Sequence, residues 1–192
     1  MKKDKIILIG GGGHCKSVID IIEQENRFEI VGIIDKKELL NSDLLGYKVI
    51  GCDDDLVLLY KKYKYAFITV GHIKSNTTRV KLFNTVKSIG YTIPTIISPF
   101  AYISQYAKIG EGTLIAHHSF INADVTIGKN CIINTKAIIE HDTTIEDNCH
   151  ISTGAIINGG VKVKENSFLG SGSVTKEYIE ISGFNKAGEL LK

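Results

Sequence analysis

Aliphatic residues recur at every sixth position through much of the second half of the chain. They run from Ile103 to Leu169, twelve in all, without a gap. The positions between these two are Ile109, Ile115, Ile121, Ile127, Ile133, Ile139, Ile145, Ile151, Ile157 and Val163. A six-residue period fits neither the α-helix nor the alternation of a single strand. It is typical of a solenoid in which each hexapeptide forms one short strand and one corner.

A second column of residues supports this interpretation. Two positions before each aliphatic residue stands a small or β-branched one: Ala101, Ala107, Thr113, Ser119, Val125, Cys131, Ala137, Thr143, Cys149, Ala155, Val161 and Ser167. If three hexapeptides make one triangular coil, residues 18 apart lie above one another, and the twelve make four coils. Gly159 is then expected above His141, and Cys149 above Cys131 in the inward column.

The first half of the chain follows a different pattern. It alternates short apolar strands with amphipathic helices, which predicts a small Rossmann-like unit with a parallel sheet. The expected strands are 5–9, 29–34 and 65–70, the expected helices 16–25 and 77–90, and a glycine turn occupies 10–13. Pro94 and Pro99 mark the joint, so we expect three parts, residues 1–95, 96–173 and 174–192. The last part is expected to leave the repeat, so that Tyr178, Ile179, Ile181 and Phe184 cap the open strand edge or meet a partner.

Composition and charge narrow the class of protein. Hydrophobic residues make up 43% of the chain, enough for a proper core. The formal net charge of +2 gives no basic excess, so no nucleic-acid partner is expected. No apolar run approaches the length of a membrane span, and Ile6–Ile9 is too short for a signal sequence. We therefore expect a cytoplasmic protein that does not associate with membranes, whose four cysteines are thiols.

Several short motifs accompany this architecture. They are Ile9-Gly10-Gly11-Gly12-Gly13-His14, Ile34-Asp35, Asn134-Thr135, Ile139-Glu140-His141-Asp142 and His150-Ile151-Ser152-Thr153-Gly154-Ala155. With these motifs the chain resembles the bacterial sugar acetyltransferases of the sialic-acid O-acetyltransferase type and the UDP-4-amino-sugar N-acetyltransferases of bacillosamine and perosamine synthesis. The resemblance implies an α/β unit followed by a left-handed parallel β-helix, a homotrimer with active sites between protomers, and acetyl-CoA as co-substrate.

The resemblance also implies roles for residues of the β-helix. His141 matches the general base that removes the acceptor's proton, a task that suits a near-neutral imidazole. Asp142 matches the acid that orients the base. His150, Gly159 and Ser171 match positions that contact acetyl-CoA. The alternatives are a solvated corner for His141, a half-exposed edge histidine for His150, and a loop bulge at Gly159.

In the α/β half, the resemblance assigns the nucleotide-sugar acceptor to the glycine turn and two strand ends. The matching residues are Gly12, Gly13, His14, Asp35, Lys36 and Gly71. Amides at a helix N-terminus suit a phosphate or a polar sugar group. His14 could instead cap the helix, and the turn by itself also fits a weak dinucleotide signal. Asp53-Asp54-Asp55 is expected to start a helix.

Other candidate sites are weaker. His117 and His118 adjoin at a corner, but Pro99 and Thr135 in the same column offer no metal ligands, so no metal is expected. Cys131 and Cys149 are close enough for a disulfide, but two small thiols filling the column are the simpler interpretation.

These observations favour an acetyl-CoA-dependent enzyme that acetylates the 4-amino group of a UDP-linked sugar. A sialic-acid-type O-acetyltransferase needs the same base. Because relatives continue further at the C-terminus, a catalytically silent partner of a sialic-acid biosynthetic enzyme also fits, and so does a nucleotide-sensing module.

Overall fold

The computed structural model describes residues 3–192, which form two compact units. The first unit contains the residues up to Gly71 together with Thr77–Pro94. The second contains His72–Asn76 together with Thr95–Lys192. The short segment 72–76, which lies between a strand and a helix of the first unit, therefore belongs to the second.

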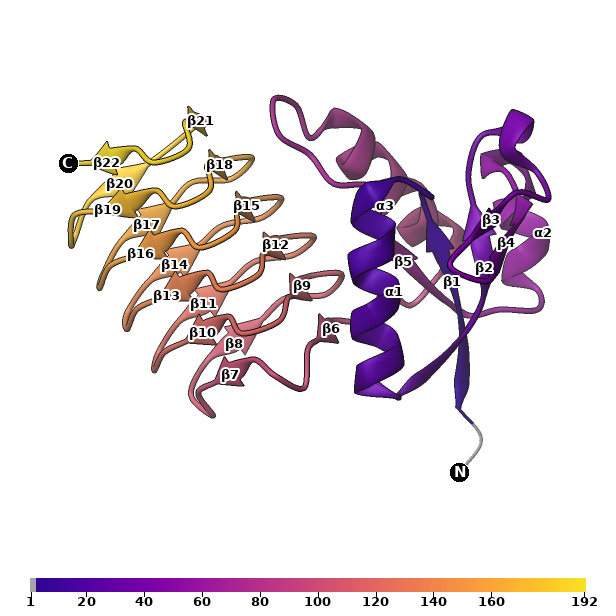
Figure 1. The fold of residues 1–192 in the computed structure, drawn as a ribbon, viewed down its shortest axis with the longest axis horizontal. Helices are drawn as coiled ribbons and strands as arrows, with labels where there is room; N and C mark the ends of the chain where they lie inside the picture. The colour runs from indigo at the N-terminus through magenta and orange to yellow at the C-terminus, as the bar shows by residue number, and fades with distance from the viewer. Residues whose placement is uncertain (1–2) are drawn as a thin grey trace. The chain divides into compact units, whose positions relative to one another are not determined.

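The first unit is a five-stranded sheet with helices (Figure 1). Its elements are β1 (Asp4–Ile9), α1 (Gly13–Glu25), β2 (Phe28–Ile34), η1 (Lys37–Leu39), β3 (Asp43–Leu44), β4 (Tyr47–Gly51), η2 (Asp53–Asp55), α2 (Leu56–Tyr60), β5 (Tyr65–Ile68) and α3 (Thr77–Ile89). The strand order is β3-β4-β2-β1-β5, and only β3 is antiparallel to its neighbour. The predicted Rossmann-like unit is confirmed, with β3, β4 and α2 added to it.

Local sequence explains the glycine turn at residues 10–13 and the helical turn that begins at Asp53. Gly10 has φ +103°, and a Cβ there would overlap Val70, so no other residue fits easily. The triple aspartate forms η2, where the carboxylate of Asp55 accepts the amide of Cys52 at 2.9 Å. That hydrogen bond lowers the pKa of Asp55. The expected helix start is confirmed.

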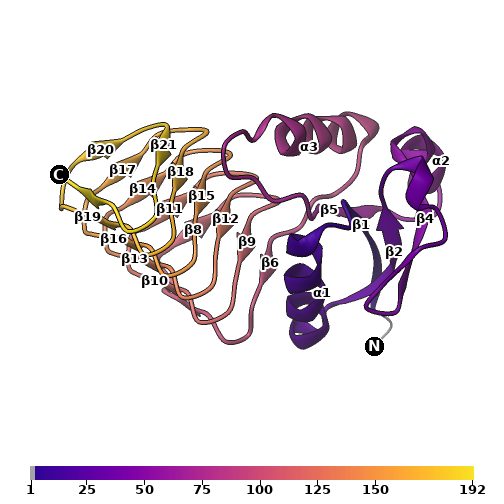
Figure 2. The ribbon, with the colours of Figure 1, turned by 45° about the horizontal axis from the view of Figure 1, so that its top comes forward.

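The second unit is a triangular prism of parallel strands (Figure 2). The first sheet contains β6 (Ile96–Ile97), β9 (Leu114–Ile115), β12 (Ile132–Ile133), β15 (His150–Ile151), β18 (Phe168–Leu169) and β21 (Phe184–Asn185). The second sheet contains β7 (Tyr102–Ile103), β10 (Phe120–Ile121), β13 (Ile138–Ile139), β16 (Ile156–Ile157), β19 (Val174–Thr175) and β22 (Leu190–Leu191). The third contains β8 (Lys108–Ile109), β11 (Thr126–Ile127), β14 (Thr144–Ile145), β17 (Lys162–Val163) and β20 (Glu180–Ile181).

The second residue of nearly every two-residue strand points into the prism. From Ile115 to Leu169 these inward aliphatic residues are all buried in one core cluster. Cys131 and Cys149 are also buried there, each as a free thiol whose Sγ donates to backbone carbonyl oxygens. The expected inward thiols are confirmed.

The corners of the prism share one backbone conformation. Every sixth residue from Gly112 to Tyr178 is left-handed, with φ between 54° and 68°. These twelve residues are Gly112, His118, Asp124, Asn130, Lys136, Asp142, Asn148, Gly154, Gly160, Asn166, Gly172 and Tyr178. Glycine, asparagine and aspartate adopt this conformation most readily, which explains most of the positions.

The expectation that residues 174–192 leave the repeat is wrong. Strands β19, β20, β21 and β22 continue the three sheets to Leu191. The first two of these strands keep the 18-residue spacing, since Val174 pairs with Ile156 and Ile181 with Val163. Leu169 then pairs with Asn185, 16 residues later, because the corner at Ser182 and Gly183 is two residues shorter. The prism begins at Ile96–Ile97, one strand before the aliphatic column that starts at Ile103.

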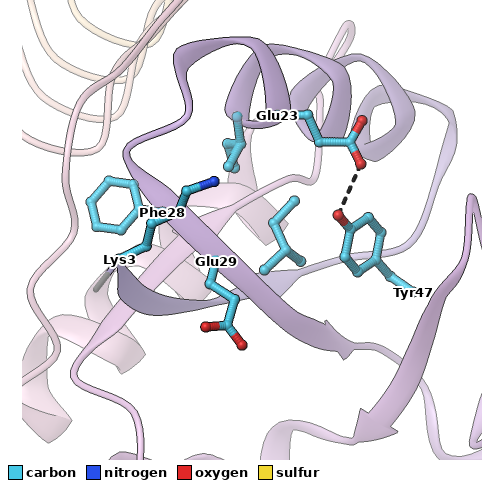
Figure 3. A pocket seen from close by; sticks show the side chains of 7 residues that line it. Lys3, Glu23, Phe28, Glu29 and Tyr47 are labelled. Atoms are coloured by element: carbon cyan, nitrogen blue, oxygen red, sulfur yellow. Dashed lines mark hydrogen bonds between the residues drawn. The ribbon is translucent and has the colours of Figure 1, made fainter. Parts of the chain in front are cut away.

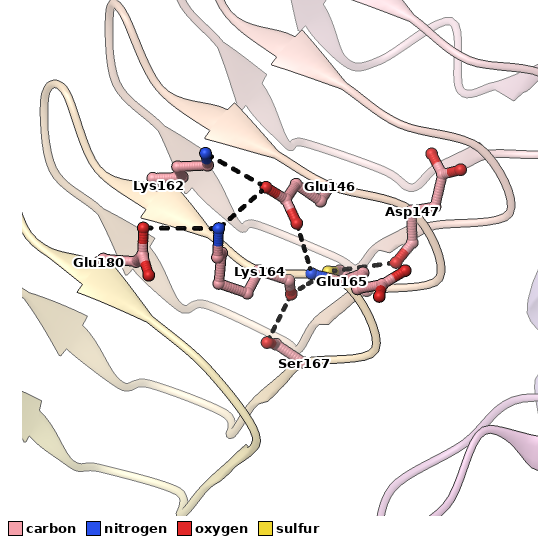
Figure 4. Close-up of polar contacts among 8 residues, drawn as sticks. Glu146, Asp147, Lys162, Lys164, Glu165, Ser167 and Glu180 are labelled. Atoms are coloured by element: carbon pink, nitrogen blue, oxygen red, sulfur yellow. Dashed lines mark hydrogen bonds and ion pairs between the residues drawn. The ribbon is translucent and has the colours of Figure 1, made fainter.

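The third sheet presents a charged outer face (Figure 4). The carboxylate of Glu146 lies 3.4 Å from Nζ of Lys162 and 3.5 Å from Nζ of Lys164, which in turn lies 3.6 Å from Glu180. The Glu165 amide donates to the same carboxylate at 3.1 Å. This amide and the lysines lower the pKa of Glu146. Such a network is typical of a solvated face.

Candidate active site

His141 and Asp142 occupy a corner between the second and third sheets. Nδ1 of His141 lies 2.8 Å from Oδ2 of Asp142, and both side chains are about half exposed. A carboxylate only accepts, so Nδ1 carries the proton and the lone pair lies on Nε2. The shorter side chain of aspartate therefore still reaches the ring. The arrangement gives an accessible basic nitrogen in a fixed orientation.

Gly159 lies directly above this imidazole, one coil further along the chain. A Cβ at Gly159 would come within 2.8 Å of Cε1 and 2.9 Å of Nε2 of His141. The Gly160 amide donates to the His141 carbonyl oxygen at 2.9 Å, which fixes the two corners on one another. The prediction that Gly159 stacks above His141 is confirmed. Glycine at this position lets the imidazole lie directly against the backbone, where any side chain would overlap the ring.

His150 is placed on β15 of the first sheet, and only 6% of it is exposed. Its Nδ1 donates to the His72 carbonyl oxygen at 2.7 Å, and its Nε2 lies 3.3 Å from Nδ2 of Asn134. The rings of His72 and Phe168 meet it edge to face. Both ring nitrogens thus have partners within the unit, so the half-exposed edge histidine is not found.

The segment His72–Asn76 holds this arrangement against the prism. Nδ2 of Asn76 donates to Oδ1 of Asn166 at 2.8 Å and to the Asn148 carbonyl oxygen at 3.3 Å. Nothing in the composition of this segment distinguishes it from an ordinary strand-to-helix loop, so its contact with the prism could not be predicted.

Ser171 lies at a different corner, between the first and second sheets. Its hydroxyl is 2.9 Å from that of Ser152. His117 lies at the same corner, three coils below Ser171. Its Nδ1 is 2.6 Å from the Ser98 hydroxyl. Within one chain, His141, Asp142 and Gly159 come together, whereas His150 and Ser171 lie on other parts of the prism.

The residues predicted to bind the acceptor gather at one end of the first unit's sheet. The amide of Gly11 donates to Oδ2 of Asp35 at 2.5 Å, and the amide of Lys36 donates to Oδ1 at 2.7 Å. Asp35 therefore ties the glycine turn to the end of β2. The carboxyl ends of parallel strands are where α/β sheets commonly bind ligands.

Around the start of α1, space is left beside the backbone. Gly12 is the N-cap of α1, and a Cβ at Gly12 or Gly13 would meet nothing within 4 Å. A Cβ at Gly71 would contact the side chain of His14 at 3.3 Å, so these two predicted residues are neighbours. The open amides at this helix end suit an anionic group.

Two residues beneath the turn were not predicted. The Thr69 hydroxyl donates to the Gly10 carbonyl oxygen at 2.5 Å and is fully buried. Burial raises the pKa of the Cys15 thiol to about 11, so this cysteine is neutral. No motif in the sequence marks either residue for its place beside the turn.

A cavity of about 630 Å³ opens at the other end of α1 (Figure 3). Ile22 and Glu23 of α1 line it with Phe28 and Tyr47, whose hydroxyl donates to Glu23 at 2.9 Å. Burial and the Glu23 carboxylate raise the pKa of Tyr47 to about 12. None of the predicted binding residues lines this cavity.

Among residues 3–192, no three or more His, Cys, Asp or Glu side chains converge as a metal site. No helix in this part of the chain has the length and apolar character needed to cross a membrane.

Two families match consecutive parts of the chain. Residues 5–86 match the family described as PglD N-terminal domain. Residues 106–141, 124–159 and 142–177 match bacterial transferase hexapeptide, a family of six repeats. A curated relative, uncharacterized protein L142 of Acanthamoeba polyphaga mimivirus, is 36% identical over 110 residues, which are 57% of this chain. The match spans only 21% of that relative's length.

Solved structures match nearly the whole chain. The H141N mutant of perosamine N-acetyltransferase from Caulobacter crescentus, in complex with CoA and GDP-perosamine, is 30% identical with a TM-score of 0.91. The match covers 98% of this chain and 88% of that one. The acetyltransferase domain of PglB from Neisseria gonorrhoeae FA1090, in complex with acetyl coenzyme A, is 25% identical with a TM-score of 0.90. It covers 99% of this chain and 93% of the domain.

The similarity extends over both units and agrees with the resemblance seen in the sequence. The prism is accordingly the left-handed parallel β-helix of hexapeptide transferases. The chain belongs to the sugar N-acetyltransferase family of hexapeptide-repeat acyltransferases, in which a PglD-type N-terminal domain precedes the prism.

Proposed function

We propose that this protein transfers the acetyl group of acetyl-CoA to the 4-amino group of a nucleotide-linked sugar. The observation that supports the proposal best is the corner at His141. There a half-exposed histidine is held at Nδ1 by a carboxylate and lies against the backbone of Gly159. The relatives solved with CoA, acetyl coenzyme A and GDP-perosamine supply the class of the two substrates.

The proposed chemistry is direct transfer. The sugar amine attacks the thioester carbonyl carbon, and Nε2 of His141 accepts the proton that the nitrogen loses. The C–S bond then breaks, and the imidazolium returns the proton to the departing thiolate. Asp142 keeps the lone pair on Nε2 and stabilises the charged ring while it holds the proton.

An apolar outer face supports the trimer that the proposal includes. The outward residues of the second sheet are Tyr102, Phe120, Ile138, Ile156, Val174 and Leu190. Tyr102 and Leu190 are 56% and 69% exposed, and Tyr102 stacks on Phe120 with ring centroids 4.9 Å apart. The corresponding residues of the third sheet are Lys108, Thr126, Thr144, Lys162 and Glu180. An apolar column beside a charged one is the pattern of an interface with another copy.

Threefold packing through the second sheet would also complete the site. In such a ring, two different corners of neighbouring prisms lie side by side. One is the corner between the second and third sheets, and the other is the corner between the first and second sheets of the next prism. The base at His141 would then face the neighbour's corner that carries Ser171. This arrangement would bring Gly159 of one chain near Ser171 of the next, although the two residues lie on separate corners of one chain.

The acceptor is assigned to the first unit. Gly12 and Gly13 at the start of α1, His14 beside Gly71, and the Asp35-Lys36 strand end provide amides, an imidazole and charged groups. Amides at a helix N-terminus suit the diphosphate of a nucleotide sugar. The silent-partner alternative loses its main support, because the prism continues to Leu191.

The direct test measures thiol release from acetyl-CoA with a panel of acceptors. UDP- and GDP-linked 4-amino sugars are expected to give turnover, whereas the matching 4-hydroxy sugars and sialic acids are not. Calorimetry with CoA accompanies the assay. Absence of CoA binding, or turnover confined to the hydroxyl acceptors, would contradict the proposal.

Substituting Gly159 tests the packing of the base against this glycine. Gly159→Ala is expected to lower acetyl transfer at least tenfold, since the added methyl group would lie within 2.9 Å of Nε2 of His141 and displace the ring. The backbone itself should accept alanine, because Ala123 already occupies this column two coils below. Thermal melting is therefore expected to change by no more than about a degree or two, as for other mild surface substitutions. Full activity of this variant would show that the position of the imidazole against Gly159 does not matter for transfer.

A further inference from the structure

The left-handed corner positions follow a rule of composition that three residues break. Of the twelve positions, nine hold glycine, asparagine or aspartate, and the exceptions are His118, Lys136 and Tyr178. Tyr178 departs furthest, because a bulky aromatic residue is a clear outlier at φ +55°. Backbone strain of this kind persists mainly where a side chain is needed for binding or catalysis.

Tyr178 lies on the corner that carries the base. Its amide donates to the Gly159 carbonyl oxygen at 3.0 Å, just as the Gly160 amide donates to that of His141. Two coil steps therefore connect His141 to Tyr178 through Gly159 and Gly160.

The tyrosine ring is exposed and laid along this corner. It is 74% exposed, so it contributes little to the core. A Cβ at Gly160 would overlap its Cδ1 and Cε1 atoms, so the ring covers the bare backbone of that glycine. From the base outward, the corner thus offers an imidazole lying against Gly159 and an aromatic ring lying against Gly160.

We propose that Tyr178 is a binding residue for the acyl donor and that its ring packs against the pantetheine arm of acetyl-CoA. This inference rests on the proposed function, which places the thioester beside His141 and Gly159. Two steps of about 4.8 Å separate the backbone of Tyr178 from that of Asp142, about 10 Å in all, and the ring, which lies over Gly160, is nearer to the base than its backbone. The pantetheine arm is longer than that, so the ring meets the arm and not the adenine. The face of an aromatic ring suits the flat amides and methyl groups of the arm.

The other two exceptions agree with a groove shared between prisms. His118 and Lys136 both lie at the corner between the first and second sheets, which the proposed trimer brings beside Tyr178 of the neighbour. The third kind of corner carries Asn130, Asn148 and Asn166, all of which obey the rule. Unusual side chains are therefore confined to the two corners that border the apolar second sheet.

Tyr178→Asn tests the proposal, with Tyr178→Phe as the matched control. Asparagine suits the left-handed backbone, so the variant is expected to melt no lower than the native protein. Calorimetry should show CoA binding weakened about five- to tenfold, the loss expected for one aromatic contact. Pantetheine, which lacks the adenine nucleotide, should lose the same factor. The KM for acetyl-CoA should rise equally, with kcat and the acceptor's KM unchanged, and Tyr178→Phe should behave like the native protein.

Different failures point to different errors. If Tyr178→Asn binds CoA as tightly as the native protein, the tyrosine does not touch the donor. If CoA is affected and pantetheine is not, the assignment to the arm is wrong. Loss of the trimer in this variant would make Tyr178 an interface residue instead. If the native protein binds neither probe, the proposed function fails, and this inference with it.

Discussion

Replacing His141 with alanine is expected to lower the rate of acetyl transfer by about 10²- to 10⁴-fold, the usual contribution of a general base. The imidazole is half exposed and makes one side-chain hydrogen bond, to Asp142, so its removal should leave the fold and the assembly unchanged. CoA affinity should stay within a few-fold, because the donor is held along the corner and not by the base alone. Thiol release, calorimetry and light scattering measure these three quantities. An active His141→Ala variant would refute the assignment of the base.

Asp142→Asn provides the matched control for this experiment. Asparagine keeps the left-handed backbone that Asp142 adopts at φ +61°, so only the charge is lost. The amide can still contact Nδ1 but no longer stabilises the protonated ring. We expect a smaller loss than for His141→Ala, of about 10- to 100-fold, carried by kcat and not by the KM for acetyl-CoA. Equal losses in both variants would mean that Asp142 acts as more than an orienting group.

Ile156→Glu is expected to separate the trimer into monomers and to lower activity at least about 100-fold. Ile156 is the outward residue of β16, in the middle of the apolar second sheet. Threefold packing would bury three such carboxylates without partners, at a cost of several kcal/mol for each. The prism itself should persist, because the inward residue of this strand, Ile157, is unchanged. Light scattering follows the assembly, and circular dichroism follows the strands.

Thr126→Glu serves as the control on the third sheet. Thr126 is exposed and pairs with Lys108 on one side and Thr144 on the other, so a new carboxylate stays solvated. Assembly and activity are expected to match the native protein. If Ile156→Glu becomes monomeric and stays active, the site lies within one chain, and the shared groove is wrong.

Periodic parts of this molecule could be predicted from the sequence, because each hexapeptide repeats the same local choice. One inward aliphatic residue per strand fixes the face, and the spacing of 18 fixes the vertical neighbours. Gly159 could therefore be placed above His141, and Cys149 above Cys131, without coordinates. The hydrogen bond between His141 and Asp142 was expected from the family resemblance and not from the repeat.

The remaining features depend on contacts that no repeat encodes. Thr175 and Ile181 keep the six-residue spacing, but the threonine interrupts the aliphatic column, and the shorter corner at Ser182 and Gly183 shifts the last inward positions to Asn185 and Leu191. The attachment of His72 to His150 joins residues 78 positions apart. Tyr178 was expected in a tail because it belongs to the last coil, which contains the shorter corner at Ser182 and Gly183.

The coil that closes with a sixteen-residue step also bears on how the strands above it stack. Leu169 pairs with Asn185 and Thr175 with Leu191, so β21 and β22 keep their places in the sheets although the corner at Ser182 and Gly183 is two residues shorter. The perimeter of this coil is therefore narrower than that of the coils below it. Restoring two residues between Ser182 and Gly183 is expected to return it to the 18-residue spacing without changing which strands pair.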